Sequence, residues 1–264
     1  AYLHELYQTV LRTDDVVTVG ECIDLTVESA IEVSAPEREE LNMPFLFEHT
    51  NDTIRHGKNP QRLKAILSHW QVGLHEKAWI GLAFNNHDLP RVVSMFGDDM
   101  QYREASAKLF GTLLLTLEGT PFIYQGEEIG MTGDKPDPML RTPMQWTSDR
   151  NGGFSRADPQ RLYLPPIQDP IYGFAALNVE AQAREPSSLL NWTRRLLAVR
   201  GTFRAFGRGR LTMLHPGNRK VLAYVREHDD EVILCVANLA RTAQPVELEL
   251  RAYRGRVPVE LVGR

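Results

Sequence analysis

The sequence predicts an α/β protein in which helices pack on a parallel sheet, followed by a small antiparallel β domain. In the first two thirds of the chain, short apolar segments alternate with longer segments of helical period. The short segments are apolar at most positions, as is typical of parallel strands that are buried on both faces. Beyond residue 207 the apolar residues recur with period two, which is typical of antiparallel strands.

Four strand-then-helix units account for the first part. The clearest helix places Leu63, Ile66, Leu67 and Trp70 on one face at helical spacing. A long segment over 131–173, rich in Gly, Pro and Asp, follows the fourth strand, and loops of that length are usually functional. The expected strands are 16–20, 41–47, 79–84 and 121–124, and the expected helices are 26–32, 61–71, 102–117 and 178–200.

The last part is expected to form strands over 221–225, 232–237 and 246–250, with a hairpin turn at 228–230. We therefore place a domain boundary near Phe206. Residues 1–205 would form the α/β domain, and 206–264 would form a β-sandwich domain that ends before it is complete.

Composition limits the partners. The 264 residues are 42% hydrophobic and 24% charged with a net charge of -4, which is typical of a globular chain and does not favour a nucleic acid or a membrane. Cys22 and Cys235 lie too far apart for a metal-binding spacing, so neither a metal nor a cofactor is predicted. So few cysteines favour a reducing compartment, and we expect a cytoplasmic location.

Two carboxylates are the best candidates for chemistry. Glu21 follows the first predicted strand, and Asp88, preceded by His87, follows the third. Carboxyl ends of parallel strands share one edge, so both groups are expected to face one cleft, an arrangement suited to cleaving bonds between sugars. The alternative is that Glu21 caps a helix and Asp88 is a solvated turn residue, and the residues alone leave the two interpretations equal.

Other candidate residues have simpler interpretations. His87 would donate a hydrogen bond to a sugar hydroxyl, or it is a surface histidine. For Glu127 and Glu128, an orienting hydrogen bond within the loop is favoured over proton transfer. Three aromatic residues of the long loop are predicted to be core residues rather than sugar platforms, namely Trp146, Phe154 and Tyr163.

Four segments in order resemble the α-amylase superfamily of glycoside hydrolases. They are 17–21 (VTVGE), 40–49 (ELNMPFLFEH), 85–91 (NNHDLPR) and 119–131 (GTPFIYQGEEIGM), and they look most like the α-glucosidase and oligo-1,6-glucosidase branch. Residues 141–146 (RTPMQW), 153–155 and 178–182 are similar to the trehalose synthase branch, which isomerises maltose.

The resemblance implies a (β/α)₈ TIM barrel and site roles for four residues. Glu21 would be the general acid/base, Asp88 would stabilise the transition state, His87 would bind a glucose hydroxyl, and Arg91 would lie near the aglycone. The implied mechanism is retaining, with a nucleophilic aspartate that forms a glucosyl-enzyme. The substrate would be a small oligosaccharide such as maltose or isomaltose.

The family's Gly-Phe-Arg-x-Asp motif, which holds that nucleophile, does not occur in this sequence. We therefore expect an incomplete barrel, strands five to eight, with weak or no activity unless a complementary barrel half or an oligomer completes it. The predicted function is that of a retaining α-glucosidase, with trehalose synthase as the alternative. A non-catalytic carbohydrate-binding protein is the third candidate.

Overall fold

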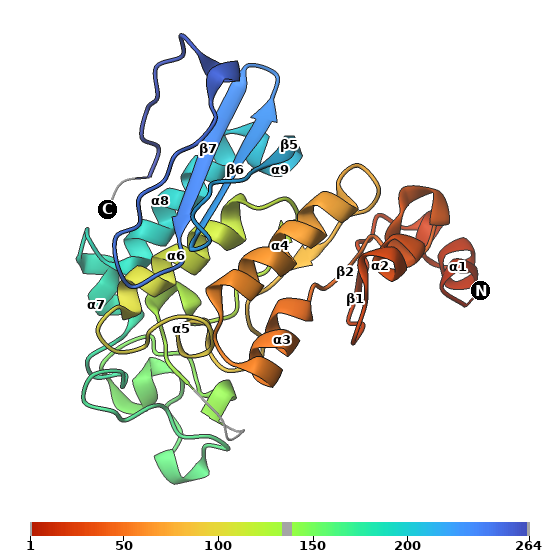
Figure 1. Ribbon diagram of the computed structural model, residues 1–264. Coiled ribbons are helices and arrows are strands. Elements are labelled where there is room, and N and C mark those ends of the chain that lie inside the picture. Colours follow the sequence, from red (N-terminus) through yellow and green to blue (C-terminus); the bar gives the residue numbers. More distant parts are fainter. Residues whose placement is uncertain (1, 134–138, 263–264) are drawn as a thin grey trace. The chain divides into compact units, whose positions relative to one another are not determined.

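The computed structural model describes residues 2–133 and 139–262. The described chain divides into two compact units. Unit 1 contains the residues up to Ala83 together with 113–122 and 200–261, and unit 2 contains 84–112 and 123–199. Figure 1 gives the order of the elements along the chain.

Unit 1 contains four short parallel strands, β1 (Val19–Gly20), β2 (Met43–Pro44), β3 (Gly81–Leu82) and β4 (Thr120–Pro121). β1 pairs with β2 and β3 pairs with β4, both in parallel, and a parallel bridge between Phe45 and Gly81 joins the two pairs. The order is therefore β1-β2-β3-β4, so the predicted parallel sheet is confirmed, with shorter strands than expected.

Gly81 lets two aromatic rings meet over the sheet. A Cβ at this position would lie 3.1 Å from the Phe45 ring and 3.2 Å from the Phe122 ring, and those rings pack edge to face with centroids 4.7 Å apart.

At the edge strand β1, in contrast, Val17 and Val19 are 72% and 36% exposed. The edge of this sheet is thus apolar and open in the described chain, which is unusual for parallel strands.

The predicted helices between the strands form. Thr26 caps α2 (Val27–Ser34) in a capping box with Ser29, and Asn59 caps α4 (Pro60–Leu74), which has proline at its first position. The face of α4 predicted from spacing is the one that is buried. The helix predicted over 102–117 is α6 (Arg103–Thr116), and the helices α1 (Tyr2–Thr9), α3 (Glu48–His56) and α5 (Val92–Met95) were not predicted.

The helix predicted over 178–200 is interrupted. It forms α7 (Val179–Arg184), capped by Asn178, and α8 (Leu189–Thr202), with Pro186 between them. Proline cannot continue a helix because it lacks the N–H and clashes with the preceding turn. A short helix, α9 (Arg204–Arg208), then leads to the last sheet.

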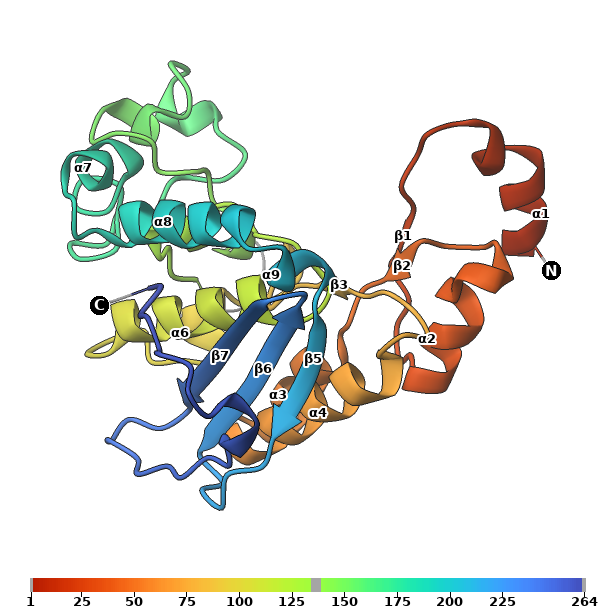
Figure 2. The same cartoon turned by 90° about the horizontal axis from the view of Figure 1, so that it is seen from above.

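The C-terminal sheet contains three antiparallel strands, β5 (Arg210–Leu214), β6 (Val221–His228) and β7 (Glu231–Asn238), which lie side by side in Figure 2. The predicted hairpin turn is confirmed, since β6 ends at His228 and β7 begins at Glu231. The strand predicted over 246–250 is wrong, because these residues have no strand partner despite their alternating pattern. β5 was missed, and the sandwich over 206–264 stays a prediction.

Two arginines, one of them fully buried, fasten this sheet to the end of α6 within unit 1. Arg226 has no exposed surface and donates to the carbonyls of Thr116 and Gly209, at 2.8 Å each. Arg200 donates to Leu115 O at 2.5 Å, and the Thr116 and Tyr224 hydroxyls are 2.5 Å apart. Positive charge at the carboxyl end of a helix meets carbonyls that lack a helical partner. The attachment therefore consists of polar contacts as well as apolar packing.

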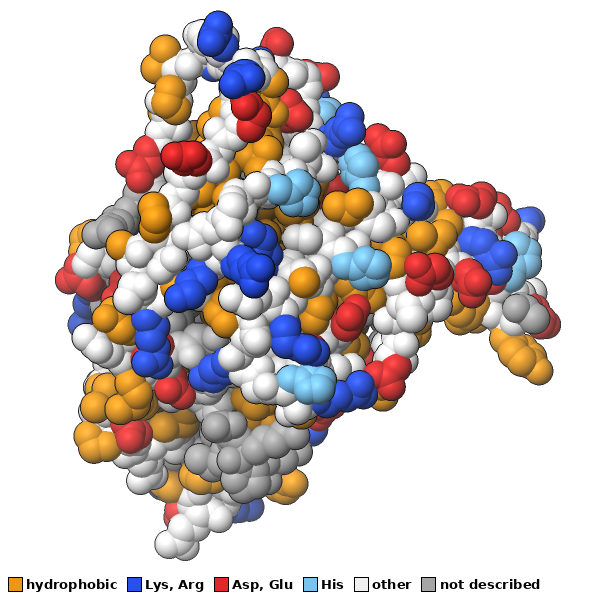
Figure 3. All heavy atoms as spheres, in the orientation of Figure 1, with side chains coloured by type: hydrophobic (Ala, Val, Ile, Leu, Met, Phe, Trp, Pro, Cys, Tyr) orange, Lys and Arg blue, Asp and Glu red, His pale blue; other side chains and the backbone are white. Residues whose placement is uncertain are grey.

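The surface matches the small net charge. On the face drawn in Figure 3, acidic and basic side chains are interspersed. Over residues 2–133 and 139–262, we find no helix that combines the length and the apolar character needed to cross a membrane.

Candidate active site

Glu21 lies at the carboxyl rim of the parallel sheet. It directly follows Gly20, the last residue of β1, whose carbonyl accepts a hydrogen bond from Phe45 N at 2.9 Å. Its side chain is exposed. Catalytic side chains of parallel barrels are found at this rim, and Glu21 is therefore placed where the sequence predicts it.

A cavity of about 420 Å³ lies next to Glu21 in unit 1, at the ends of β1 and β2. Charged side chains dominate its wall, and two ion pairs hold them in place. Asp52 pairs with Arg62, which holds the pKa of that carboxyl below its usual range, and Arg55 lies 3.4 Å from Asp24. The lining also contains Cys22, Phe47, Glu48 and His56.

In unit 2, His87 and Asp88 form a pair on the loop after β3. His87 Nε2 lies 3.4 Å from Asp88 Oδ2, and the side chains are 54% and 52% exposed. Arg141 joins them, because its guanidinium pairs with the Asp88 carboxylate and its Nε donates to His87 O at 3.0 Å. The group thus combines an imidazole, a carboxylate and a guanidinium that solvent can reach.

The loop that carries this pair is held at both ends. Asn86 Oδ1 accepts a hydrogen bond from Asp88 N at 2.8 Å, an Asx turn that fixes the backbone of the pair. Before it, the Phe84 ring packs edge to face against Phe96 and Phe110, with centroids 5.7 and 5.4 Å away. A rigid apolar anchor therefore precedes the exposed polar residues.

Arg91 closes the loop from inside unit 2. Its side chain has no exposed surface, its guanidinium lies over the Tyr124 ring at 4.6 Å, and Nη1 donates to Gln125 O. Its backbone N donates to Gly133 O at 2.9 Å. Burial lowers the pKa of Arg91. The predicted contact of Arg91 with a sugar stays a prediction, and its contacts in the described chain are with the neighbouring loop.

Glu127 and Glu128 orient the loop after β4, as expected. Glu127 Oε2 accepts a hydrogen bond from Tyr124 N at 3.0 Å, and Glu128 Oε2 accepts one from Gly126 N at 2.8 Å. Burial raises the pKa of Glu127 to about 8 in spite of the hydrogen bond from Tyr124 and the nearby Arg91 charge, which lower it. Glu127 therefore binds a proton at neutral pH.

The aromatic residues of the long loop are not in the core. Trp146, Phe154 and Tyr163 are 48%, 53% and 94% exposed, so the predicted core role is wrong for all three. The loop is ordered instead by Gln145, a buried polar residue that donates to Leu177 O and to Tyr172 O. The core of this region is aliphatic, with Ile129, Met131, Met144, Leu177 and Leu190.

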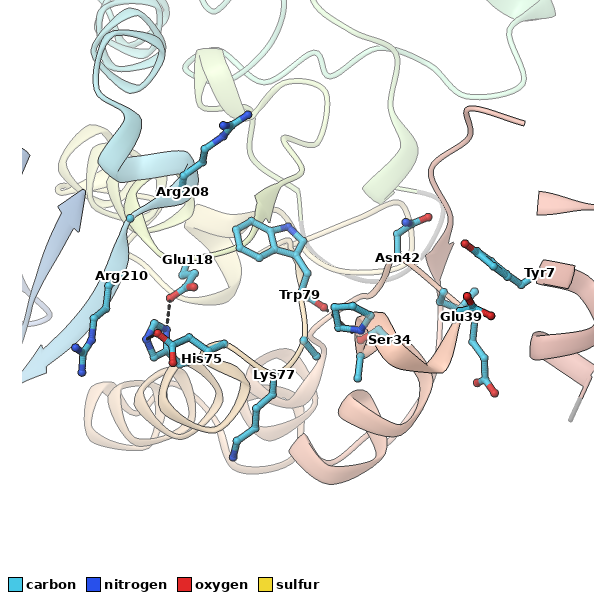
Figure 4. A pocket seen from close by; sticks show the side chains of 17 residues that line it. Tyr7, Ser34, Glu39, Asn42, His75, Lys77, Trp79, Glu118, Arg208 and Arg210 are labelled. Carbon is cyan, nitrogen blue, oxygen red and sulfur yellow. Dashed lines mark hydrogen bonds and ion pairs between the residues drawn. The ribbon is translucent and has the colours of Figure 1, made fainter. Parts of the chain in front are cut away.

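A second cavity of unit 1 lies at the opposite rim. It has a volume of about 570 Å³ and is lined by residues that precede β2, β3 and β4. Figure 4 shows Trp79 in its middle and the contact between His75 and Glu118, whose Nδ1 and Oε2 atoms are 3.2 Å apart. Residues at the amino ends of barrel strands usually serve stability, and none of the predicted site residues lines this cavity.

In the structure the side chains of His87 and Asp88 contact each other, and Arg141 forms an ion pair with Asp88. The sequence indicates Arg141 only as part of the RTPMQW motif. Glu21 lies in unit 1 and the pair lies in unit 2, and a shared cleft stays a prediction. Over the described residues, no group of three or more His, Cys, Asp and Glu side chains is placed to hold a metal ion.

Comparison with known proteins decides the family. The model of the α-amylase catalytic domain matches residues 1–209, and that of the maltogenic amylase C-terminal domain matches 211–264. The chain belongs to the α-amylase family. It therefore has the TIM-barrel fold of this family, with a C-terminal antiparallel sheet.

Several relatives of the α-amylase family are similar over much of the chain. The trehalose synthase of Pimelobacter sp. (strain R48) is 55% identical over an alignment of 165 positions, gaps included, which covers 59% of this chain and 28% of the relative. The oligo-1,6-glucosidase of Halalkalibacterium halodurans is 34% identical over an alignment of 280 positions, gaps included, which covers 90% of this chain and 49% of the relative. The chain thus spans between about a quarter and a half of these relatives.

Solved structures of the family show the same similarity. The crystal structure of Bacillus licheniformis trehalose-6-phosphate hydrolase aligns with a TM-score of 0.78 at 30% identity, covering 90% of this chain and 50% of that one. Isomaltulose synthase of Erwinia rhapontici NX5 aligns equally well, with a TM-score of 0.78 at 30% identity.

Proposed function

We propose that the chain forms part of an enzyme that cleaves α-glucosidic bonds of small oligosaccharides, such as maltose or isomaltose, with retention at the anomeric carbon. The observation that carries the proposal is the exposed His87–Asp88 pair, which Arg141 holds on the loop after β3. Glu21 at the end of β1 supplies the second carboxyl group of the reaction.

In this proposal Glu21 is the general acid/base. It donates a proton to the glycosidic oxygen as the bond to the anomeric carbon breaks, and later removes a proton from the acceptor that attacks that carbon. Asp88 stabilises the positive charge that develops on the sugar ring, and His87 donates a hydrogen bond to a glucose hydroxyl. Arg141 holds the Asp88 carboxylate in place through their ion pair.

Retention requires a nucleophile, which the family motif supplies as an aspartate on another strand. We infer that a complementary barrel half, in the same polypeptide or in an oligomer, provides it and covers the apolar edge at β1. The exposure of Val17 and Val19 supports this inference, because parallel strands are normally buried on both faces. Arg91 is assigned to the side of the departing sugar, acting through the loop that it fastens.

The two candidate reactions differ in the acceptor of the glucosyl group. Water gives the α-glucosidase reaction, which the site motifs favour. The released sugar itself, attacking in a new orientation, gives the trehalose synthase reaction. This second candidate is favoured by identities of 49 to 55% to five trehalose synthases, against 32 to 34% to three oligo-1,6-glucosidases.

The proposal is tested with the gene read upstream of the Ala1 codon and the complete reading frame expressed. Maltose is the substrate, and the products are separated by chromatography: glucose alone indicates hydrolysis, and trehalose indicates isomerisation. We expect Glu21→Gln to lower kcat by about 10²- to 10⁴-fold. Glu76→Gln, an exposed glutamate at the opposite rim, is the matched control and should retain the rate. Equal activity of both variants would contradict the role of Glu21.

The need for a complementary half has its own test. The 264-residue chain is assayed alone on p-nitrophenyl α-glucoside, and turnover below detection is expected. Robust turnover that Glu21→Gln abolishes would contradict this part of the proposal while supporting the chemistry.

A further inference from the structure

Arg91 and Glu127 link two loops of unit 2. The first loop carries His87 and Asp88 and ends at Arg91, and the second runs from Tyr124 to Met131 after β4. Arg91 connects them, because its guanidinium lies over the Tyr124 ring and donates to Gln125 O. Arg91 therefore ties the loop that carries His87 and Asp88 to the loop after β4.

Glu127 fixes the residue on which Arg91 rests. Its carboxyl accepts from Tyr124 N at 3.0 Å, while its own backbone N donates to Tyr124 O at 3.0 Å. These reciprocal bonds form a closed ring that sets the direction of the Tyr124 side chain. At the far end, the Tyr124 hydroxyl donates to Leu140 O at 3.2 Å, next to Arg141. Tyr124 thus supports Arg91 on one side and the segment of Arg141 on the other.

The charges around this link are not fully paired. Nε and Nη2 of Arg91 are buried and have no hydrogen-bond partner, although both Glu127 and Glu128 attract the guanidinium. Arg91 and Glu128 are the charged groups that act on Glu127, and the Tyr124 phenol lies against the guanidinium. Buried donors without partners are costly, and an ionised Glu127 carboxylate is a group that could accept from them.

We propose that Glu127 is a positioning residue for His87 and Asp88, which acts through Tyr124 and Arg91. In its neutral form it supports Tyr124 and leaves Arg91 on Gln125. In its ionised form it attracts the free Nε and Nη2 of Arg91, and the loop that ends at Arg91 shifts with them. This inference rests on the proposed function only in that His87 and Asp88 are taken as the reacting groups.

The test follows the His87 ring by NMR in the 264-residue chain, with its signals assigned from their loss in His87→Gln. At pH 7, Glu127→Gln should leave these signals in place, since an amide oxygen still accepts from Tyr124 N, whereas Glu127→Ala should shift them. Between pH 7 and 9.5 the chain should show a change centred near pH 8, where Glu127 ionises. Glu127→Gln should abolish this change, and Glu104→Gln, an exposed carboxylate of unit 2, should retain it.

Two results would overturn the inference: the change near pH 8 persists in Glu127→Gln, or Glu127→Ala leaves the His87 signals in place at pH 7. If Glu127→Ala does not fold, the inference is still tested by whether the change of the His87 signals near pH 8 is lost in Glu127→Gln and retained in Glu104→Gln. The readout involves no sugar, so failure of the proposed reaction in the maltose assay leaves this result standing, and the converse also holds.

Discussion

Arg226 in unit 1 and Arg91 in unit 2 are both fully buried, yet their surroundings differ. Arg226 donates to two backbone carbonyls at the end of α6 and at Gly209. Arg91 donates to one carbonyl, lies over an aromatic ring, and leaves Nε and Nη2 unpaired near two carboxyl groups. Arg226 leaves one nitrogen, Nε, without a partner, whereas Arg91 leaves two. A buried guanidinium with fewer satisfied donors contributes less to stability.

The same contrast applies to the backbone. The end of α6 is regular helix whose last carbonyls are capped by arginines. The loop around Glu127 instead contains Gly126 and Gly130 at φ of +93° and +72°. Left-handed residues concentrate at functional loops, where the surrounding structure stabilises them. Unit 1 thus ends α6 in regular helix with capped carbonyls, and unit 2 presents a loop with two left-handed glycines.

The largest effect on the free energy of unfolding is expected when Arg226, the anchoring arginine of unit 1, is replaced. Arg226→Leu removes the hydrogen bonds that Arg226 donates to the carbonyls of Thr116 and Gly209, and each lost partner of a buried group costs about 1–3 kcal/mol. We expect the free energy of unfolding to fall by about 4 kcal/mol, measured by urea denaturation. The control Arg219→Leu replaces an exposed arginine and should change it by less than about 0.5 kcal/mol. A loss of similar size in both variants would disprove the anchoring role.

The free energy of unfolding is expected to depend on pH with opposite signs for a buried group of unit 1 and one of unit 2. Burial lowers the pKa of His49 in unit 1 to about 4, so the unfolded chain binds a proton that the folded chain refuses between about pH 6.5 and 4. Stability should therefore fall on acidification through this range, by about 3 kcal/mol at most. His49→Gln should remove this slope in urea denaturation from pH 7 to 4. If the unfolding free energy of His49→Gln fell with acidification as steeply as that of the unchanged chain, the pH dependence would come from other groups.

Glu127 in unit 2 should act in the opposite direction. Its raised pKa of about 8 means that the folded chain holds a proton that the unfolded chain loses above about pH 4.5. The contribution of Glu127 to the free energy of unfolding is complete below about pH 4.5 and is lost as the pH rises toward 8. Glu127→Gln is expected to flatten the stability profile between pH 5 and 8, while His49→Gln leaves that alkaline part unchanged.

Gly126→Ala tests the site loop. An alanine Cβ there would collide with Met131 Sδ and require φ of +93°, so we expect a loss of about 2 kcal/mol in unfolding free energy. Gly207→Ala is the control, because that glycine lies in α9 with open space around it and should gain up to about 1 kcal/mol. Equal effects at the two positions would contradict the strain assigned to the loop.

The smallest effect on stability is expected for Arg91→Met. The variant loses one hydrogen bond but also removes the cost of a buried charge, for a net change of about 1 kcal/mol or less. Hydrogen exchange of the amides over 85–91 should nevertheless rise, because the loop loses its fastening. A loss comparable to that of Arg226→Leu would remove the distinction between the two arginines.

Much of this fold could be predicted locally. Spacing of apolar residues located α4, capping residues located α2 and α4, and short apolar segments located the four parallel strands. The strand expected over 246–250 failed, because a strand exists only with a partner and alternation alone does not provide one. The helix over 178–200 failed in its middle, where Pro186 outweighed the apolar period.

The site divides in the same way. The candidate residues Glu21, His87 and Asp88 could be proposed from the sequence, since strand ends and the family motifs point to them, and their sharing one site stays a prediction. The involvement of Arg141 could not, because it lies 53 positions from Asp88 and meets it only through the folded loops. The burial of Arg91 was likewise not predicted, and Trp146 was wrongly predicted to be in the core, since burial depends on neighbours distant in the chain.

The sequence by itself determined the family, the positions of the four parallel strands and the chemical types of the candidate groups, because these depend on local pattern and on motifs. Only the tertiary structure decided which charges meet: Arg141 with Asp88, and Arg91 with Tyr124 and Gln125. The physical reason is that electrostatic and packing energies depend on distances and burial, and loops far apart in the chain set both only after they fold.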